Sequence, residues 1–156
     1  MRRAAAAAAL CAAAGCTALG VIKAYPGSDR GKDEIGIVAT ALREETFSVT
    51  DNRITTIDGV RYGKGDYEAH MLPGAHRIGV EGTLRVSRQV RVQHCIFDLN
   101  VEPGCTYRPT IPAYPRAQLD LPADSEWRVT RPVTVVAECS DATYAVQLPL
   151  DCSSNP

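Results

Sequence analysis

The sequence lacks the features that mark membrane-spanning and nucleic-acid-binding proteins. Its longest apolar run, residues 4–14, has 11 residues, whereas a helix that spans a bilayer needs about 20. Lysine and arginine number 17 against 18 acidic residues, and no basic cluster is interleaved with aromatic side chains. Because nucleic-acid binding needs several cations that neutralise phosphates, nucleic acid is excluded as a partner.

Motifs of catalysis are also missing. No serine lies in a G-x-S-x-G nucleophile elbow. Gly59, Gly63 and Gly65 belong to an expected hairpin and not to a strand-to-helix junction, which excludes a phosphate-binding loop. His94 and Cys95 are adjacent, and adjacent side chains of a strand point to opposite faces, so they cannot form a nucleophilic pair. We therefore predict no catalytic residue and no cofactor.

A metal site would need histidines that converge. His70 and His76 flank Pro73-Gly74, with Glu68 nearby, but the sequence shows no third ligand. Structural metal sites usually use three or four protein ligands. We therefore expect structural roles for both histidines and predict no metal.

Two groups of side chains could contact a glycan or an anionic group. Arg85, Arg88 and Arg91 recur along one expected strand pair, and a solvated face is the preferred interpretation of this row. Tyr114 and Trp127 could stack on a sugar, but such residues are more often partly buried anchors.

The N-terminus has the organisation of an export signal. Arg2 and Arg3 precede the apolar run, which ends in Ala13-Ala14-Gly15-Cys16. This ending resembles the bacterial lipobox, so we predict that residues 1–15 are removed and that Cys16 is acylated and binds membrane lipid. A plain secretory signal with an incidental cysteine is the alternative. Thr17, in place of aspartate, resembles the outer-membrane sorting pattern and predicts an outer-membrane lipoprotein that faces the periplasm.

The remaining cysteines fit an oxidising compartment. Cleavage removes Cys11 and acylation uses Cys16, which leaves an even number: Cys95, Cys105, Cys139 and Cys152. Two disulfides are predicted, each worth about 2–4 kcal/mol, and three pairings stay open. A four-thiolate zinc site is an alternative, but it normally needs closely spaced cysteine pairs. Free buried thiols are the third possibility.

The mature chain divides into two parts. Residues 16–34 are polar and turn-rich and are expected to form the lipidated N-terminus and a tether. Residues 35–156 contain short β-prone runs without a sustained helical period, which predicts a small all-β domain, an antiparallel β-sandwich, with an eight-stranded closed barrel as the alternative. The expected strands are Ile35–Leu42, Thr46–Thr50, Arg53–Ile57, Tyr67–Leu72, His76–Val86, Val90–Val101, Thr106–Ile111, Trp127–Cys139 with a break at Pro132, and Thr143–Leu148.

Turn signals support this interpretation. Asp58-Gly59 between apolar flanks predicts a type I′ hairpin, and the Pro-Gly pairs at 73–74 and 103–104 predict two type II reversals. Between them, alternation over residues 91–101 places one set of side chains inward: Cys95, Phe97, Leu99 and Val101. Four prolines predict an irregular loop over residues 109–125.

With these turns in place, a family resemblance can be stated. Ile57-Asp58-Gly59, followed by residues 72–80 (LPGAHRIGV), resembles the I-D-G … L-P-G-x-H-x-I-x-V pattern of the PEGA-like β domains and of small uncharacterised proteobacterial lipoproteins. Tyr25-Pro26-Gly27 and Pro103-Gly104-Cys105-Thr106-Tyr107 extend the resemblance, which covers about residues 10 to 108. It implies a small sandwich and names no ligand. If Tyr25-Pro26-Gly27 docks on the domain, the tether is shorter.

The sequence thus favours a non-enzymatic binding or structural module, anchored in the bacterial envelope, whose partner is an envelope protein or a glycan. The alternative is an envelope hydrolase or metal-dependent enzyme whose residues converge only in three dimensions.

Overall fold

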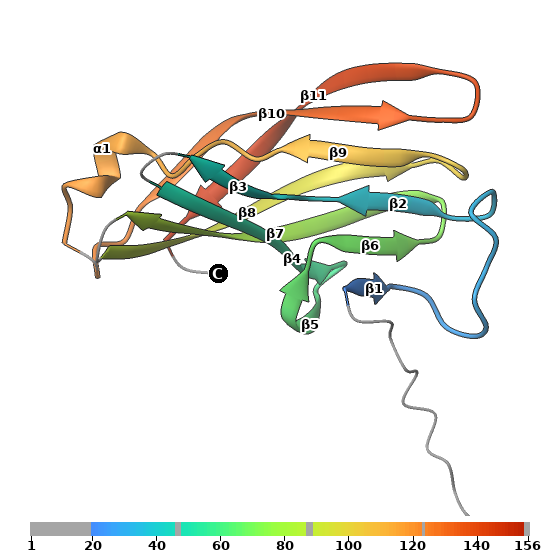
Figure 1. The fold of residues 1–156 in the computed structure, drawn as a ribbon, viewed down its shortest axis with the longest axis horizontal. Coiled ribbons are helices and arrows are strands. Elements are labelled where there is room, and N and C mark those ends of the chain that lie inside the picture. The colour runs from blue at the N-terminus through green and yellow to red at the C-terminus, as the bar shows by residue number, and fades with distance from the viewer. Residues whose placement is uncertain (1–19, 46–47, 87–88, 123, 155–156) are drawn as a thin grey trace, which may run out of the picture.

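In the computed structural model, the described residues (20–45, 48–86, 89–122 and 124–154) are almost entirely β-structure (Figure 1). The predicted signal and Cys16 lie outside them. The strands are β1 (Val21–Lys23), β2 (Gly36–Ala39), β3 (Leu42–Glu45), β4 (Ser48–Ile57), β5 (Val60–Asp66), β6 (Glu68–Met71), β7 (Gly74–Val86), β8 (Gln89–Val101), β9 (Thr106–Thr110), β10 (Arg128–Glu138) and β11 (Thr143–Ser153). The short helix α1 (Arg116–Leu119) interrupts the loop between β9 and β10. In the described ranges, no helix has the length and apolarity to cross a membrane.

The strands form a single mixed sheet of 11 strands, in the order β1-β6-β2-β9-β10-β11-β8-β7-β4-β3, with β5 paired to β4. The pairs β1–β6 and β2–β9 are parallel, and the other pairs are antiparallel. The prediction of an all-β domain is confirmed. The expected pair of antiparallel sheets is replaced by one continuous, mixed sheet.

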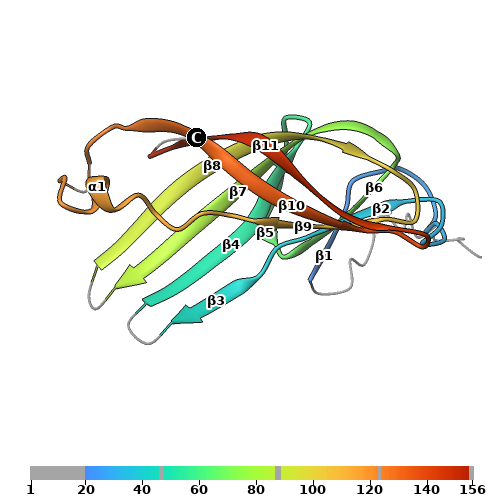
Figure 2. The ribbon, with the colours of Figure 1, turned by 90° about the horizontal axis from the view of Figure 1, so that it is seen from above.

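The segment that contains β2 and β3 explains this continuity. β2 pairs with β6 and β9, whereas β3 pairs with β4 at the far end of the strand order. Only Thr40 and Ala41 separate the two strands. The Thr40 hydroxyl donates to Asn52 O at 2.7 Å, and its backbone N–H donates to Tyr67 O at 2.7 Å. Because one segment belongs to both regions, the sheet curls nearly into a barrel (Figure 2).

Several strand boundaries differ from those expected. Residues 48–57 form one strand, where two were predicted, and β5 was missed because its glycines lower strand propensity. β10 also passes without a break through Pro132, which lies opposite Pro149 of β11. The ladder of β10 with β9 reaches only Thr134, and that of β11 with β8 reaches only Asp151, so neither extends to the two prolines.

The predicted hairpin at Asp58-Gly59 is confirmed. Both residues have positive φ, 51° and 79°, and Ile57 pairs with Val60. The glycines of the two Pro-Gly pairs, Gly74 and Gly104, also have positive φ. However, β6 does not pair with β7, nor β8 with β9, so these turns carry the chain between separate parts of the sheet and form no hairpins.

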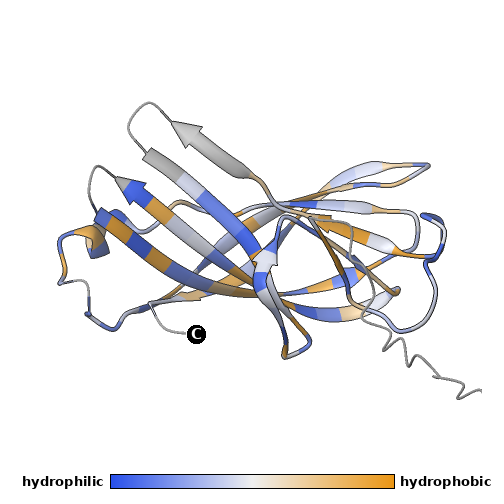
Figure 3. Ribbon diagram, turned by 60° about the horizontal axis from the view of Figure 1, so that its bottom comes forward, coloured by the Kyte–Doolittle hydropathy of each residue, from blue (hydrophilic) through white to orange (hydrophobic). Residues whose placement is uncertain are grey.

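The interior contains the predicted apolar face of β8. Cys95, Phe97, Leu99 and Val101 are each 5% exposed or less, and the alternation of apolar and polar residues is visible along the strands (Figure 3). Apolar side chains of β7, β9 and β10 complete this core.

Part of the predicted tether is folded. β1 pairs with β6, and Tyr25 is buried against Ile35 and Ile37. Residues 26–34 are exposed. A tether that spans all of 16–34 is therefore too long, because the apolar side chains of Ile22 and Tyr25 pack onto the domain.

Candidate functional site

One end of the sheet interior is lined by polar side chains. β7 ends and β8 begins there, beside the loop that carries α1 (Figure 2). The inward positions of the strands at this end, together with one residue of α1, form a set that we call the polar-end cluster: Asn52, Arg91, Gln93, Gln118 and Arg131. Asn52 is 4% exposed and Gln93 is 1% exposed.

The strand β8 places two members of the cluster. Arg91 and Gln93 have the same parity as Cys95 and Phe97, so all four side chains point inward. Arg91 and Gln93 thus lie on the same face of β8 as the apolar residues that form the core. The inward face of β8 therefore changes from apolar to polar at Cys95.

A glycine brings the two buried amides together. Asn52 lies opposite Gly82, which in turn lies opposite Gln93. A Cβ atom at Gly82 would lie 2.9 Å from Asn52 Oδ1 and 3.0 Å from Gln93 Nε2. Because glycine lacks this atom, the side-chain amides of Asn52 and Gln93 can both lie over β7, the strand between β4 and β8.

Gln93 and Arg131 hold the loop that follows β9. Arg131 Nη2 donates to Gln93 Oε1 at 2.9 Å, and Arg131 Nη1 donates to Ala113 O at 2.8 Å. Gln93 Nε2 donates to Pro112 O at 3.0 Å. Burial lowers the pKa of Arg131, and no carboxylate opposes this shift. The oxygen acceptors of this partly buried cation are thus both neutral, one backbone carbonyl and one side-chain amide.

Arg91 holds the next part of the loop in the same way. Its Nη2 donates to Leu121 O at 3.2 Å and to Leu119 O at 3.5 Å. Tyr114 near the start of the loop and Trp127 at its end pack edge to face with ring centroids 5.3 Å apart, and Trp127 Nε1 donates to Tyr114 OH at 2.9 Å. The expectation that these two aromatic residues are anchors is confirmed.

The unsatisfied polar atoms gather in this cluster. Among the described side chains, the buried nitrogen and oxygen atoms without a hydrogen-bond partner in the protein are Asn52 Oδ1, Arg91 Nε, Gln118 Oε1 and Arg131 Nε. Each such group costs about 1–3 kcal/mol when it is left unsatisfied. Two are donors and two are acceptors, so a group that satisfies all four must both accept and donate hydrogen bonds.

A cavity lies at the rim of the cluster. It has a volume of about 520 Å³ and is lined by Gln89 and Arg91 of β8 and by residues 119–122 of the loop. Its acidic residue, Asp120, is exposed and forms no ion pair with Arg91. Small-molecule sites have volumes of roughly 300–1,000 Å³, so the cavity is large enough for a small ligand.

A second, smaller groove lies on the outer face of β8 and its neighbouring strands. It has a volume of about 360 Å³, and its lining residues come from β7, β8, β10 and β11: Arg77, His94, Ile96, Arg128, Thr130, Asp151, Cys152 and Ser153. Here Glu81, His94 and Ser153 form a cross-strand row. His94 Nδ1 lies 3.7 Å from Glu81 Oε2. Burial lowers the pKa of His94 and outweighs the opposing effect of Glu81, so the imidazole is neutral at pH 7.

The two histidines considered as metal ligands bind separate carboxylates. His70 Nε2 lies 2.7 Å from Glu68 Oε1. His76 Nδ1 lies 2.7 Å from Asp58 Oδ2, and its other ring nitrogen lies 2.7 Å from Leu72 O. Both nitrogens of His76 are therefore occupied by protein groups, and the expected structural place for this residue is a link between the Asp58-Gly59 turn and β7.

The pairing of the strands around the core also brings the predicted cysteines together in pairs. The disulfides are Cys95–Cys152 and Cys105–Cys139, which confirms the prediction of two bridges and selects one of the three pairings. Cys95 lies opposite Cys152 in the β8–β11 ladder, and Cys105–Cys139 extends the β9–β10 ladder by one pair. Neither a four-thiolate zinc site nor free thiols fit these bridges.

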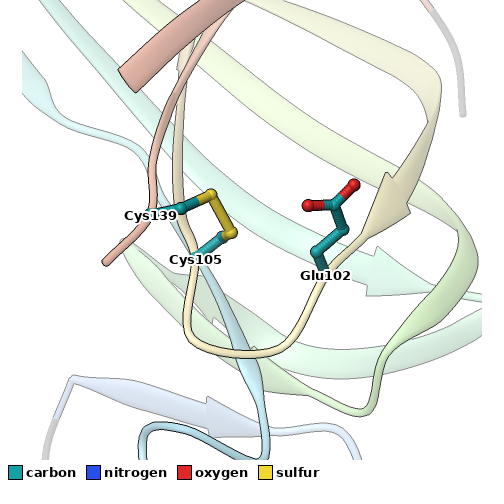
Figure 4. Close-up of side chains that lie close together, drawn as sticks. All are labelled: Glu102, Cys105 and Cys139. Carbon is teal, nitrogen blue, oxygen red and sulfur yellow. A yellow bond between two sulfur atoms is a disulfide. The ribbon is translucent and has the colours of Figure 1, made fainter. Parts of the chain in front are cut away.

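Glu102 lies close to the second bridge (Figure 4). Its carboxylate and the sulfur atoms of Cys105 and Cys139 lie within 4.8 Å of one another. Metal binding by cysteine requires thiolates, and both sulfur atoms are oxidised, so this group cannot act as a metal site.

The arginines at 85, 88 and 91, which the sequence suggested as one row, do not form a shared exposed surface in the described residues. Arg85 is exposed, Arg91 points inward to the loop carbonyls, and Arg88 lies outside the described residues. The polar-end cluster itself was missed, because Asn52, Gln93 and Arg131 come from three distant segments. The available signal was the parity of Arg91 and Gln93 with the apolar face of β8.

Comparison with known proteins gives no relative. No family model, curated protein or solved structure matches the chain. The resemblance to the PEGA-like domains therefore stays a prediction.

Proposed function

We propose that this chain is a lipid-anchored protein of the bacterial envelope that binds a ligand at the polar-end cluster and has no enzymatic activity. In this proposal residues 1–15 are removed, and acylated Cys16 holds the domain at the outer membrane, facing the periplasm. The sequence Ala13-Ala14-Gly15-Cys16 supports the anchor, and two disulfides fit an oxidising compartment. Membership of the PEGA-like lipoproteins is part of the same proposal.

The observation that carries the binding function is the convergence of unsatisfied polar atoms in one place. Buried polar groups in folded proteins nearly always have partners, because leaving them unpaired destabilises the fold. Asn52, Arg91, Gln118 and Arg131 each keep one such atom, and Arg91 also lines a cavity. Unpaired polar groups that lower stability next to a cavity are expected where function, such as ligand binding, outweighs their cost. An envelope glycan or an envelope protein is the expected partner.

The anchor is tested by mass spectrometry of the native protein from membranes. The wild type should begin at Cys16 and carry added acyl mass. Cys16→Ser should remove this mass and release the protein from the membrane or leave it uncleaved, whereas the control Cys11→Ser should change neither. Membrane retention of the Cys16→Ser protein without acyl mass would contradict the anchor.

The binding site is tested by photo-crosslinking in intact cells. A photoreactive amino acid at Leu121, which is exposed beside the cavity, should give a specific adduct. The same group at Val60, exposed on β5 away from the cluster, is the matched control. Equal adducts from both positions, or none from position 121, would count against a ligand at the polar end.

A second candidate is hydrolysis at the outer groove, favoured by the row Glu81–His94–Ser153. In this alternative Ser153 would be the nucleophile, neutral His94 the base, and Glu81 the group that orients the imidazole. Directly opposite residues of an antiparallel pair have Cβ atoms about 4.5–5.5 Å apart, which permits contact between the serine and the histidine.

A fluorophosphonate probe separates the two candidates. If the row is catalytic, the purified protein should be labelled, Ser153→Ala should abolish labelling, and Ser140→Ala should retain it. No labelling of the wild type, or equal labelling of the Ser153→Ala protein, leaves the binding function as the one supported.

A further inference from the structure

We infer that β11 is a docking edge for a second copy of this chain, which pairs antiparallel with it through residues 143–147 and forms a two-fold dimer. This inference concerns a different part of the molecule from the polar-end cluster and does not depend on the proposed binding function. Three features of the β10–β11 hairpin carry it: a free backbone edge, the lack of charge along that edge, and a register in which every available backbone group finds a partner.

Most of β11 has a strand neighbour on one side only. β11 pairs with β10 along its whole length, from Thr143 to Ser153, but with β8 only from Asp151 to Ser153. Among the described parts of the chain, residues 143–150 therefore have no strand partner on the side away from β10. In Figure 1 this stretch runs along the upper right margin of the molecule, and no labelled element lies beyond it.

The alternation of the antiparallel ladder shows which backbone groups face the free side. Cys139 N–H donates to Ala142 O at 2.8 Å, and this bond sets the alternation of hydrogen bonds between β10 and β11. Counted from it, Thr143, Ala145 and Gln147 turn their N–H and C=O groups away from β10. All three residues are exposed, so these groups are accessible to another strand.

Pro149 ends this edge. It has the same orientation as Gln147, so its nitrogen, which carries no hydrogen, faces the free side. A proline is tolerated there because an edge strand forms no ladder bond on that side. The part of the edge that can both donate and accept hydrogen bonds is therefore residues 143–147.

The free edge of β11 lacks the features that protect sheet edges. Natural edge strands avoid pairing with other chains by being short, by carrying charged side chains or by containing proline. β1 has only three residues, β3 (LREE) is mostly charged, β5 (VRYGKGD) contains glycines and charged residues, and the part of β8 beyond its ladder with β11 contains Asp98. Residues 143–148 of β11 (TYAVQL) contain neither charge nor proline. Of the edges in the described ranges, this one is the best suited to pair with another strand.

The rest of the hairpin holds this edge in place. Cys139, directly after β10, is bonded to Cys105, directly before β9. Val133, Val135 and Ala137 of β10 are fully buried in the core. A strand that is already ordered loses little conformational entropy when another strand pairs with it, which favours association.

A second copy of β11 fits this edge in one register. When Ala145 lies opposite the partner's Ala145, Thr143 lies opposite the partner's Gln147, and all the free N–H and C=O groups of these residues form hydrogen bonds. Tyr144, which is 38% exposed, then lies opposite the partner's Val146. Aromatic and β-branched side chains pair favourably across strands, so the side chains support the same register.

The composition of the edge favours a copy of itself over an unrelated strand. Since residues 143–148 are uncharged, two copies approach without the like-charge repulsion that opposes self-pairing of a charged strand. Pro149 also selects the register, because a two-fold axis at Gln147 would bring its nitrogen into the ladder, where it cannot donate. An interface of one strand pair is small, so we expect a weak dimer.

The first test is disulfide trapping in intact cells. Ala145→Cys places two cysteines opposite each other at the two-fold axis, and the Cα separation of about 5.5 Å in such a pair lies within the range of disulfides. After mild oxidation we expect a covalent dimer of the full-length protein. The matched control is Thr134→Cys, an exposed position on the same face of β10 and one strand away from the edge, which should give no dimer.

The second test adds charge at the axis. In sedimentation equilibrium of the full-length protein in detergent, the wild type should dimerise as its concentration rises. Ala145→Lys and Ala145→Glu should each weaken the dimer by about tenfold or more, because like charges then meet across the axis. An equal mixture of these two proteins should restore dimerisation, and the control Thr134→Lys should leave it unchanged. Position 145 is exposed, so these variants are expected to fold.

Three results would overturn the inference. The first is a wild type that stays monomeric at every concentration, together with no trapped dimer of the Ala145→Cys protein. The second is dimerisation of the Ala145→Lys and Ala145→Glu proteins equal to that of the wild type, since the dimer would then use another surface. The third is a trapped product that contains a different protein, which would make the partner a foreign strand. None of these results changes the crosslink at Leu121, so the proposed binding function is judged separately.

Discussion

The two ends of β8 serve different purposes within one strand. Towards its C-terminus the inward residues are Phe97, Leu99 and Val101, all buried in the apolar core. Towards its N-terminus the inward residues are Gln93 and Arg91, which bond the loop after β9. The backbone pairing with β7 is continuous along both ends. The strand pairing is thus shared, and the side chains alone divide the interior into an apolar end and a polar end.

The disulfides follow the same division. Cys105–Cys139 extends the β9–β10 ladder beside the turn at Glu102, and Cys105 is part of the apolar core. Cys95–Cys152 lies where the inward face of β8 becomes polar, and Cys152 Sγ is 3.9 Å from Arg131 Nη2. The first bridge therefore stabilises the apolar end, and the second also positions the polar-end cluster.

The largest expected effect is on the free energy of unfolding, which substitutions at the two ends of β8 should lower by different amounts. Phe97→Ala should lower the free energy of unfolding by about 3–5 kcal/mol, because it leaves a cavity in a close-packed core. Gln93→Ala at the polar end should cost about 1–3 kcal/mol, since it removes the hydrogen bonds that Gln93 forms with Arg131 Nη2 and Pro112 O. Denaturant unfolding measures both values, and equal losses would contradict the division.

The disulfides should have the next largest effect. Loops of 57 and 34 residues predict that loss of either bridge, by Cys95→Ala with Cys152→Ala or by Cys105→Ala with Cys139→Ala, costs about 4 kcal/mol. Only loss of Cys95–Cys152 should also increase hydrogen exchange in the loop 111–122. Equal exchange in both double variants would show that this bridge does not position the polar end.

A smaller effect should come from Gly82→Ala. The added Cβ meets Asn52 and Gln93 at about 3.0 Å, so overpacking should cost about 1–3 kcal/mol and separate the two amides. Gly59→Ala is the control, because it has open space around it and loses about 1 kcal/mol or more through its positive φ of 79°. The crosslink at Leu121 should weaken in the first variant and persist in the second.

The smallest effect concerns pH. Because burial lowers the pKa of His94, the unfolded chain takes up a proton more readily than the folded one. The stability that the neutral imidazole contributes is present above the unfolded pKa of about 6.5 and is lost as pH falls through the folded value. His94→Gln should reduce this loss between pH 7 and pH 5 in denaturant titrations. An unchanged slope would show that His94 is not the group that titrates.

The turn at Asp58 belongs to the apolar end and titrates at lower pH. Burial raises the pKa of Asp58, but the hydrogen bonds from Arg77 N–H and His76 lower it by more. The net pKa of Asp58 therefore lies below its usual value. The carboxylate thus stabilises the fold above the unfolded pKa of about 3.9, and this contribution is lost as pH falls through the folded value. The two groups therefore report on the two ends in different pH ranges.

Local patterns were sufficient for much of the fold. The Asp58-Gly59 hairpin, the inward face of β8 and the presence of two disulfides were predicted, because each depends on neighbouring residues or on the compartment. The single sheet was not predicted, because it depends on the pairing of β2 with β9 and of β3 with β4 across large sequence separations. The polar-end cluster was missed for the same reason.

The amino-acid sequence by itself determined the β-rich character, the main turn at Asp58-Gly59 and the alternation that points Phe97 and Gln93 to the same side. These properties follow from backbone sterics and from a side-chain period of two residues. Only the tertiary structure decided which cysteines pair, how residues 36–45 connect the sheet, and that Asn52, Gln93 and Arg131 meet. Such contacts depend on strand register between distant segments, which short-range preferences do not specify.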